Sequence, residues 1–140
     1  VIVGDSQRPA LSELFVQDAI RRGHVAAEVE KARSRAFNGP GLAALVGRVR
    51  EGVADVPAHE QWLCIGGALM NFLNALHLMG FGAKALSGAS VSDPDIRSAF
   101  CDEGETLVTW VLAGRPTRAA HPKRVDAVSQ IIGNWSLPRR

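Results

Sequence analysis

Apolar residues at helical spacing mark the first part of the chain. Four of them recur at intervals typical of one helix face: Leu11, Leu14, Phe15 and Ala19. Asp5 or Ser6 can cap this predicted helix, Pro9 suits its first turn, and Gly23 ends it. A second, more polar helix is predicted over residues 25–36, with three residues turned inward: Val29, Ala32 and Ala36.

Short apolar runs bounded by turn residues predict strands. Residues 42–49 and 106–113 are rich in apolar and β-branched side chains, and glycine or charged residues close each run. Residues 83–86 enter a shorter strand, and residues 1–3 resemble the end of a buried one. A short helix is predicted to start at Asp93 and Pro94. Because helices separate the strands, we predict an α+β domain with a mixed or antiparallel sheet flanked by helices.

The most apolar part of the chain begins near residue 58 and predicts a long central helix that is buried on most sides. Residues 61–83 contain no Asp, Glu, Lys or Arg and are long enough to cross a bilayer. However, Asn71, Asn74 and His77 interrupt the run, as do several glycines, and no charge asymmetry flanks it. We therefore expect a helix in a globular core and no contact with a membrane.

The composition is that of one globular domain that does not bind nucleic acid. The 140 residues are 46% hydrophobic, and 16 basic residues against 14 acidic ones give a formal charge of +2. Cys64 and Cys101 lie far apart in no ligand-like spacing, so we predict two buried apolar side chains and no metal site. The first residues do not resemble a secretory signal, which makes the cytoplasm the expected compartment.

Several segments together resemble a known family. Residues 66–82 combine a small-residue start, an apolar helix and a Gly-Phe-Gly turn. Ser87-Gly88 follows, then residues 93–100, and then a strand that ends in Leu-Ala-Gly-Arg-Pro at residues 112–116. In this order and spacing the chain resembles the nitroreductase family, and its compact bacterial branch in particular through three short matches: Val56-Pro57, Glu60-Gln61 and Ser87-Gly88-Ala89.

The resemblance implies an FMN-dependent oxidoreductase that reduces nitro groups, quinones or similar electrophilic acceptors with NAD(P)H. Family members are homodimers with FMN at the subunit interface. Because the flavin itself carries the hydride, no catalytic side chain is expected.

The resemblance also implies two binding segments. The predicted flavin edge, where backbone N–H groups reach the isoalloxazine ring, comprises Ala85, Leu86, Ser87 and Gly88. The predicted nicotinamide segment lies at the end of the central helix and comprises Ala75, Leu76, His77, Leu78, Met79 and Gly80. The residues alone leave simpler alternatives open: Ser87-Gly88 as an ordinary turn, and His77 as a structural helix histidine.

The N-terminal Arg-x-Ser-x-Arg motif with which the family grips the FMN phosphate has no counterpart here. We therefore expect a single domain over residues 1–140 that lacks its flavin-clamping segment. The alternative to an enzyme is a truncated or diverged non-enzymatic module of the same fold, which serves in flavin binding or dimerisation.

Residues 117–140 are predicted to form a basic C-terminal tail. The simpler interpretation is that its charged side chains are solvated. The family resemblance offers an alternative, contact with the FMN phosphate, for the four cations that follow the last strand: Arg115, Arg118, Lys123 and Arg124. Ile131, Ile132 and Trp135 are apolar enough to suggest packing on a partner subunit.

Overall fold

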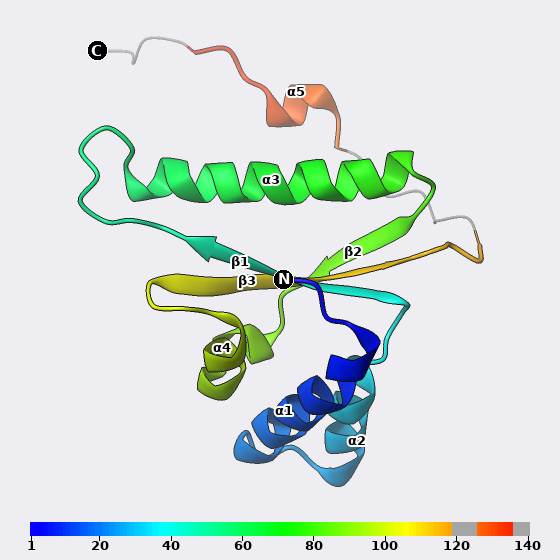
Figure 1. Ribbon diagram of the computed structural model, residues 1–140. Coiled ribbons are helices and arrows are strands. Elements are labelled where there is room, and N and C mark those ends of the chain that lie inside the picture. The colour runs from blue at the N-terminus through cyan, green and yellow to red at the C-terminus, as the bar shows by residue number, and fades with distance from the viewer. Residues whose placement is uncertain (119–125, 136–140) are drawn as a thin grey trace.

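A computed structural model describes residues 1–118 and 126–135, and Figure 1 shows its elements. In chain order these are the 3-10 helix η1 (Asp5–Gln7), α1 (Arg8–Arg21), α2 (Ala26–Arg35), β1 (Gly41–Arg48), α3 (Ala58–Leu78), β2 (Gly82–Leu86), the 3-10 helix η2 (Ala89–Ser92), α4 (Pro94–Phe100), β3 (Glu105–Gly114) and α5 (Val128–Ile131). The predicted helices are confirmed, as are all the predicted strands except the first.

The three strands form one antiparallel sheet in the order β1-β3-β2, which confirms the predicted α+β class. β3 is the central strand and pairs with β1 along nearly its whole length and with β2 over its second half. Residues 1–3 form no full strand: Ile2 makes a single bridge with Ala43, and the N–H of Val3 donates to the Leu42 carbonyl at 2.9 Å. This short pairing widens the sheet at its β1 edge.

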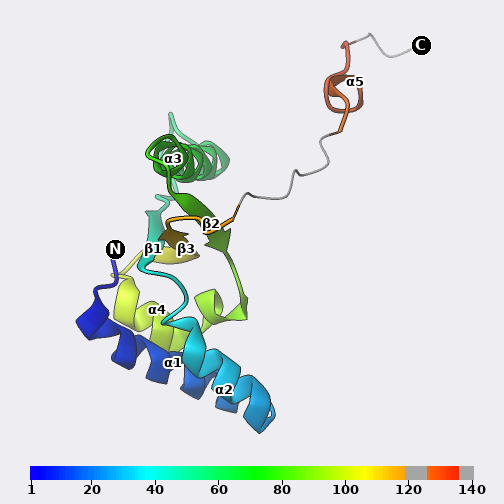
Figure 2. The ribbon, with the colours of Figure 1, turned by 90° about the vertical axis from the view of Figure 1, so that its right-hand side faces the viewer.

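The hydrophobic core lies between one face of the sheet and helices α1, α2 and α4, which Figure 2 shows together on that side. Trp110 of β3 packs edge-to-face against Phe15 of α1 and Phe100 of α4, with ring centroids 5.5 and 5.0 Å apart. Ile96 and Leu107 belong to the same buried cluster. Burial of these aromatic and branched side chains is the main stabilising contribution to this half of the molecule.

The start of α1 differs from the prediction. Asp5 and Ser6 do not cap the helix: they lie in η1, and Gln7 is the N-cap residue. Arg8, which is 5% exposed, instead fixes this end, because its guanidinium donates to three backbone carbonyls: Ala36 at 3.0 Å, Gly39 at 2.9 Å and Pro40 at 2.7 Å. These bonds join α1 to the segment that leads from α2 into β1.

Helix α3 runs across the other face of the sheet, away from α1, α2 and α4 (Figures 1 and 2). It is the predicted long central helix, but the prediction that it is buried is wrong for the single chain, because none of its residues is buried. One stripe is half-buried: Gln61, Ile65, Leu69, Leu73 and Leu76. On the far side, Leu63, Met70 and Leu78 are 72%, 53% and 85% exposed. An apolar pattern shows that a helix needs cover, but not whether its own chain supplies it.

The prediction that both cysteines are buried is wrong for Cys64, which lies on α3 with its side chain exposed. Cys101 follows α4, is half-buried and packs against the core, which confirms the prediction in part. Within the parts of the chain that the structure describes, no helix has the length and apolar character to cross a membrane.

The C-terminal segment contains one element that the sequence did not predict, the short helix α5. Ile131, Ile132 and Trp135 are exposed. Lys123 and Arg124 lie outside the described residues. Packing of the tail on a partner subunit therefore stays a prediction.

Candidate functional site

The predicted flavin edge lies where β2 leaves the sheet. Ala85 and Leu86 are the last residues of β2, pair with β3 and are half-buried. Ser87 and Gly88 follow in an exposed turn, directly before η2 begins at Ala89. The central strand thus fixes one end of this segment, while the other end faces solvent.

The side chain of Ser87 ties the turn to β3. Its hydroxyl donates to Oγ1 of Thr109 at 3.2 Å, and the buried Thr109 hydroxyl in turn donates to the Trp110 carbonyl at 3.2 Å. Because this arrangement uses the hydroxyl proton of Ser87, the Ser87 oxygen keeps its lone pairs to accept a further hydrogen bond.

The backbone at Gly88 is open to a ligand. Gly88 is extended, with φ −103° and ψ 177°, and its carbonyl accepts the N–H of Val91 at 3.2 Å. A Cβ built on this residue would have no neighbour within 4 Å. A planar ring can therefore approach the peptide groups of Gly88 without meeting a side chain.

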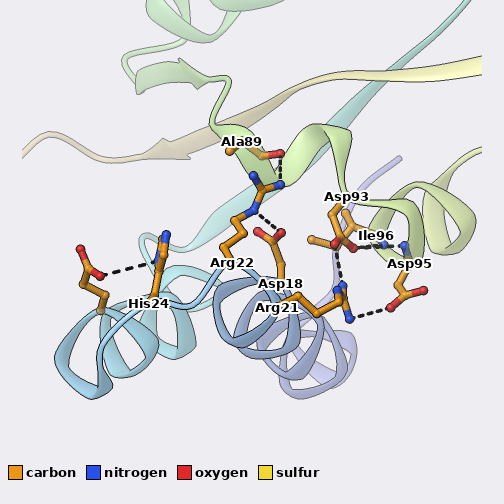
Figure 3. Close-up of polar contacts among 9 residues, drawn as sticks. Asp18, Arg21, Arg22, His24, Ala89, Asp93, Asp95 and Ile96 are labelled. Atoms are coloured by element: carbon orange, nitrogen blue, oxygen red, sulfur yellow. Dashed lines mark hydrogen bonds and ion pairs between the residues drawn. The ribbon is translucent and has the colours of Figure 1, made fainter.

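Arg21, the last residue of α1, and Arg22, its C-cap residue, contact the start of α4 and the start of η2, as Figure 3 shows. Arg22 donates through Nη2 to the Ala89 carbonyl at 2.9 Å and through Nε to the buried Asp18 carboxylate. Arg21 contacts Asp93 at 2.6 Å and Asp95 at 2.8 Å. Each guanidinium is therefore already paired with carboxylates of the same chain.

Asp93 connects this charge network to α4. Its carboxylate, which is 3% exposed, caps the helix by accepting the N–H groups of Asp95 and Ile96, both at 3.1 Å. Burial by itself would raise the pKa of Asp93, but the hydrogen bond from Arg21, the two backbone N–H groups and the charge of Arg21 outweigh burial and lower it. The hydrogen bond to Asp93 likewise raises the pKa of Arg21.

Sequence reasoning missed Asp18, Arg21 and Arg22. The available signal was the position of Asp18 and Arg22, which fall on the helix face that also carries Leu11 and Phe15. A charged residue on an apolar stripe is rarely buried without a partner, so the i,i+4 spacing of Asp18 and Arg22 was a signal for an ion pair on this face.

The predicted nicotinamide segment forms the C-terminal cap of α3. The N–H of Phe81 donates to the Leu76 carbonyl and the N–H of Gly80 to the His77 carbonyl, both at 2.9 Å. With Gly80 at φ 81°, this is a Schellman cap, which needs a residue in the left-handed conformation at this position. The carbonyls of Leu76 and His77 are therefore used by the cap, and the exposed side chains of His77, Leu78 and Met79 are what the segment offers a ligand.

The single chain does not bring the two predicted segments together. The nicotinamide segment ends at Gly80, before β2, and Ser87 follows β2, so the length of the strand separates these two positions, on the order of 15 Å at the usual rise per residue. Arg115 lies at the nicotinamide end, 5.6 Å from the centre of the Phe81 ring. Within one chain, neither Arg115 nor the nicotinamide segment lies beside Ser87 and Gly88.

Comparison with known proteins identifies the fold. No family model matches the chain. The protein named "Putative NAD(P)H nitroreductase YdjA" in Escherichia coli K12 is 33% identical over 117 residues, which are 83% of this chain and 63% of that protein. Its namesake in Escherichia coli O157:H7 matches equally. In sequence the chain is therefore similar to a nitroreductase.

A solved structure supports the same fold. The nitroreductase-like family protein from Bacillus cereus has a TM-score of 0.70 to this chain, covering 94% of it and 68% of its own chain, at 15% identity. The predicted nitroreductase-like fold is thus confirmed. Because the chain spans 63% of the length of its Escherichia coli relatives, the activity in their name refers to a longer protein.

Proposed function

We propose that this chain serves in a cytoplasmic FMN-dependent oxidoreductase that reduces nitro groups, quinones or similar electrophilic acceptors with NAD(P)H. The main support is the exposed Ser87-Gly88 turn at the end of β2, in a chain 33% identical to a protein named as an NAD(P)H nitroreductase. This similarity supports the chemistry, and the turn supports the place at which a flavin binds.

The groups of the turn suit the edge of a flavin ring. The ring edge around N5 and O4 needs hydrogen-bond donors, and the turn offers backbone N–H groups at two small residues, Gly88 and Ala89. The Ser87 oxygen adds an acceptor for the neighbouring ring N–H. The turn does not suit a phosphate, because Arg21 and Arg22 are already paired with carboxylates. We therefore assign only the ring edge of FMN to Ala85, Leu86, Ser87 and Gly88.

When it is bound, FMN supplies the hydride chemistry of the reaction. The residues of the chain bind and orient the flavin: Ser87 and Gly88 hold the ring edge. The small side chain of Ser87 and the absence of one at Gly88 allow close approach. We propose that the nicotinamide segment, with His77, Leu78 and Met79 exposed, contributes to binding of the NAD(P)H donor in a dimer, where segments of two chains can meet.

A homodimer formed through α3 is part of this proposal. Leu63 and Met70 on the far side of α3 are seven residues apart, as are Gly67 and Asn74, and Leu78 follows. This spacing is that of a seam between paired helices. All five residues are exposed in the single chain, so a second α3 would cover apolar surface that water now contacts. The family resemblance implies that FMN binds at such an interface.

Substitution of Gly88 tests the assignment of the flavin edge. We expect the purified full chain to bind FMN and oxidise NADPH, and Gly88→Val to weaken FMN binding at least tenfold, with Gly88→Ala in between. The fold should tolerate both changes, because φ −103° is an ordinary conformation for valine and the added Cβ meets no atom within 4 Å.

Fluorescence titration of FMN measures the affinity, and urea unfolding checks the fold. Gly4→Val is the matched control, since Gly4 is exposed and a Cβ there would lie 3.5 Å from Gln7. If Gly88→Val binds FMN as tightly as the wild type does, the turn is not part of the flavin site. A wild-type chain that is colourless after incubation with FMN and removal of the free flavin would contradict the proposed function.

The second candidate function is a non-enzymatic module that serves in dimerisation or weak flavin binding. The pairing of Arg21 and Arg22 with carboxylates favours it, because the turn then offers the FMN phosphate no cation. Under this alternative the chain forms dimers but does not oxidise NADPH. Stoichiometric FMN together with NADPH oxidation by the 140-residue chain would exclude it.

A further inference from the structure

The turn at the predicted flavin edge has few restraints of its own beyond the hydrogen bond that the Gly88 carbonyl accepts from the N–H of Val91. Gly88 has no side chain, and nothing lies within 4 Å of the place a Cβ would take. Glycine has the most backbone freedom of any residue, so an unrestrained turn would sample many conformations. Its order must come from contacts to either side.

On one side, the hydrogen bond from Ser87 to Thr109 fixes the turn to the central strand. On the other side, Arg22, the C-cap residue of α1, reaches the Ala89 carbonyl at 2.9 Å, one residue after Gly88 (Figure 3). These two bonds enclose Gly88. Arg22 and Ala89 are 67 residues apart in sequence, so only the tertiary structure brings them into contact.

The orientation of Arg22 is itself set by a buried group. Asp18 is 6% exposed and accepts from Nε of Arg22, one helical turn away. A guanidinium is planar, so a carboxylate bound at Nε fixes the direction in which Nη2 donates. The Asp18–Arg22 pair therefore acts as a rigid support under Ala89.

Arg21 and Asp93 anchor the following residues in the same way. Asp93 caps α4 and pairs with Arg21 at 2.6 Å, so the far end of η2 is also held by α1. Two adjacent residues at the C-terminal end of α1, Arg21 and the cap residue Arg22, thus hold both ends of η2. Arg22 is the one bonded next to the predicted flavin edge.

We propose that Arg22, oriented by Asp18, is a positioning residue for the flavin edge: it holds the Ala89 carbonyl and thereby fixes the direction of the Ser87 and Gly88 peptide groups. The proposal rests on the proposed function. Arg22 touches neither cofactor nor substrate in this scheme, and its charge is balanced by Asp18. Arg22 therefore acts on flavin binding through the direction of its hydrogen bonds and not through its charge.

The test compares the unsubstituted 140-residue chain with Arg22→Gln, Arg22→Lys and the control Arg33→Gln. Arg33 pairs with Glu13 and Glu30 on the exposed side of α1 and α2 and does not contact the turn. The first measurement is FMN affinity by fluorescence titration. The second is amide hydrogen exchange of the FMN-free chain, resolved at residues 87–92. The third is the visible absorption spectrum of bound flavin.

We expect Arg22→Gln to weaken FMN binding roughly tenfold, as loss of one charge-assisted hydrogen bond allows. We also expect faster exchange at residues 88–90 and a shifted flavin absorption band, with unchanged exchange in β3. Arg22→Lys should restore little, because an ammonium is a point donor that cannot hold Asp18 and Ala89 in a fixed fork. Arg33→Gln should behave as wild type.

The outcomes separate the two proposals. Absence of FMN binding by the wild-type chain would overturn the proposed function and this inference with it. Wild-type binding with unchanged affinity or unchanged exchange in Arg22→Gln would overturn the positioning role alone. Full restoration by Arg22→Lys would also overturn it, since charge rather than geometry would then explain the effect. If Arg22→Gln does not fold, Arg22→Lys, which keeps the charge beside Asp18, supplies the same comparison.

Discussion

At the scale of single residues, three buried charged side chains determine much of the local geometry. Arg8, Asp18 and Asp93 are 5%, 6% and 3% exposed, and each has hydrogen-bonding partners inside the chain. Charged groups are buried only where partners compensate for lost water. Each of these residues therefore has an effect on stability that can be measured separately from function.

Arg8→Met should lower the free energy of unfolding by about 3 kcal/mol, because it leaves three backbone carbonyls without their donor. Urea unfolding followed by circular dichroism measures the change. Arg33→Met is the matched control, since Arg33 makes only exposed ion pairs, and it should change stability by less than about 1 kcal/mol. Equal losses in the two variants would show that the Arg8 hydrogen bonds add little.

The lowered pKa of Asp93 predicts how the stability of the chain depends on pH. Its pKa in the folded chain lies below the ordinary value of 3.8, so the unfolded chain binds more protons as the pH falls. The stabilisation from Asp93 is complete above that ordinary value and is lost as the pH falls through the lower, folded-state pKa. Asp93→Asn keeps a capping side chain but removes the charge, so it should flatten this acid dependence.

Urea unfolding at a series of pH values from neutral to acid measures the slope. Asp102→Asn, at an exposed position, is the control and should leave the slope close to wild type. An unchanged slope in Asp93→Asn would assign the acid sensitivity to other carboxylates.

At the scale of elements, the contact between α3 and the sheet depends on a glycine in β1. A Cβ on Gly47 would lie 2.7 Å from Cδ1 of Ile65 in α3 and 3.3 Å from Cγ2 of Val108 in β3. The missing side chain lets the helix lie close to the sheet. The rest of α3 makes only half-buried contacts, so this close approach is a substantial part of its attachment.

Gly47→Val should therefore destabilise the chain by about 1–3 kcal/mol, because the added methyl groups force α3 away from the sheet. Gly47→Ala should have a smaller effect, since the end of the Ile65 side chain can turn aside. Combining Gly47→Ala with Ile65→Val should recover the loss, and a double-mutant cycle by urea unfolding measures the coupling. Additive effects of these two changes would contradict direct contact.

At the scale of the whole molecule, the described residues form a well-packed core on one face of the sheet and leave the long helix α3 uncovered on the other. Helices α1, α2 and α4 enclose the core on one face of the sheet, whereas α3 on the other face has no buried residue. An exposed helix with this apolar content is typical of an interface between subunits. The proposed dimer accounts for it.

Met70→Glu should convert the proposed dimer into monomers, because it places a charge in the middle of the seam on α3. Light scattering should give a mass of two 14.9 kDa chains for the wild type and of one for the variant. The wild-type unfolding midpoint should also rise with protein concentration, and that of Met70→Glu should not. Ile20→Glu on α1 is the matched control, since Met70 and Ile20 are both 53% exposed. A monomeric wild-type chain would contradict the dimer.

Much of this fold follows from local sequence. The periodicity of α1 and α2, the Asp93-Pro94 start of α4, the Gly80 cap of α3 and the β-branched run of β3 all act over a few residues, and the structure confirms each of them. The family resemblance also rested on the order of such short segments. Comparison with a relative and with a solved structure supports it.

The tertiary structure alone decided where polar and apolar surfaces meet. The pattern of α3 showed that it needs cover, but only the fold showed that this chain covers one stripe of it. The bond from Arg22 to Ala89 joins groups 67 residues apart, and no local pattern predicts such a contact. The predicted flavin edge and nicotinamide segment are close in sequence, but the extended β2 holds them apart. Periodicity records how a residue relates to its near neighbours, whereas burial and charge pairing depend on which distant surface the chain brings against it.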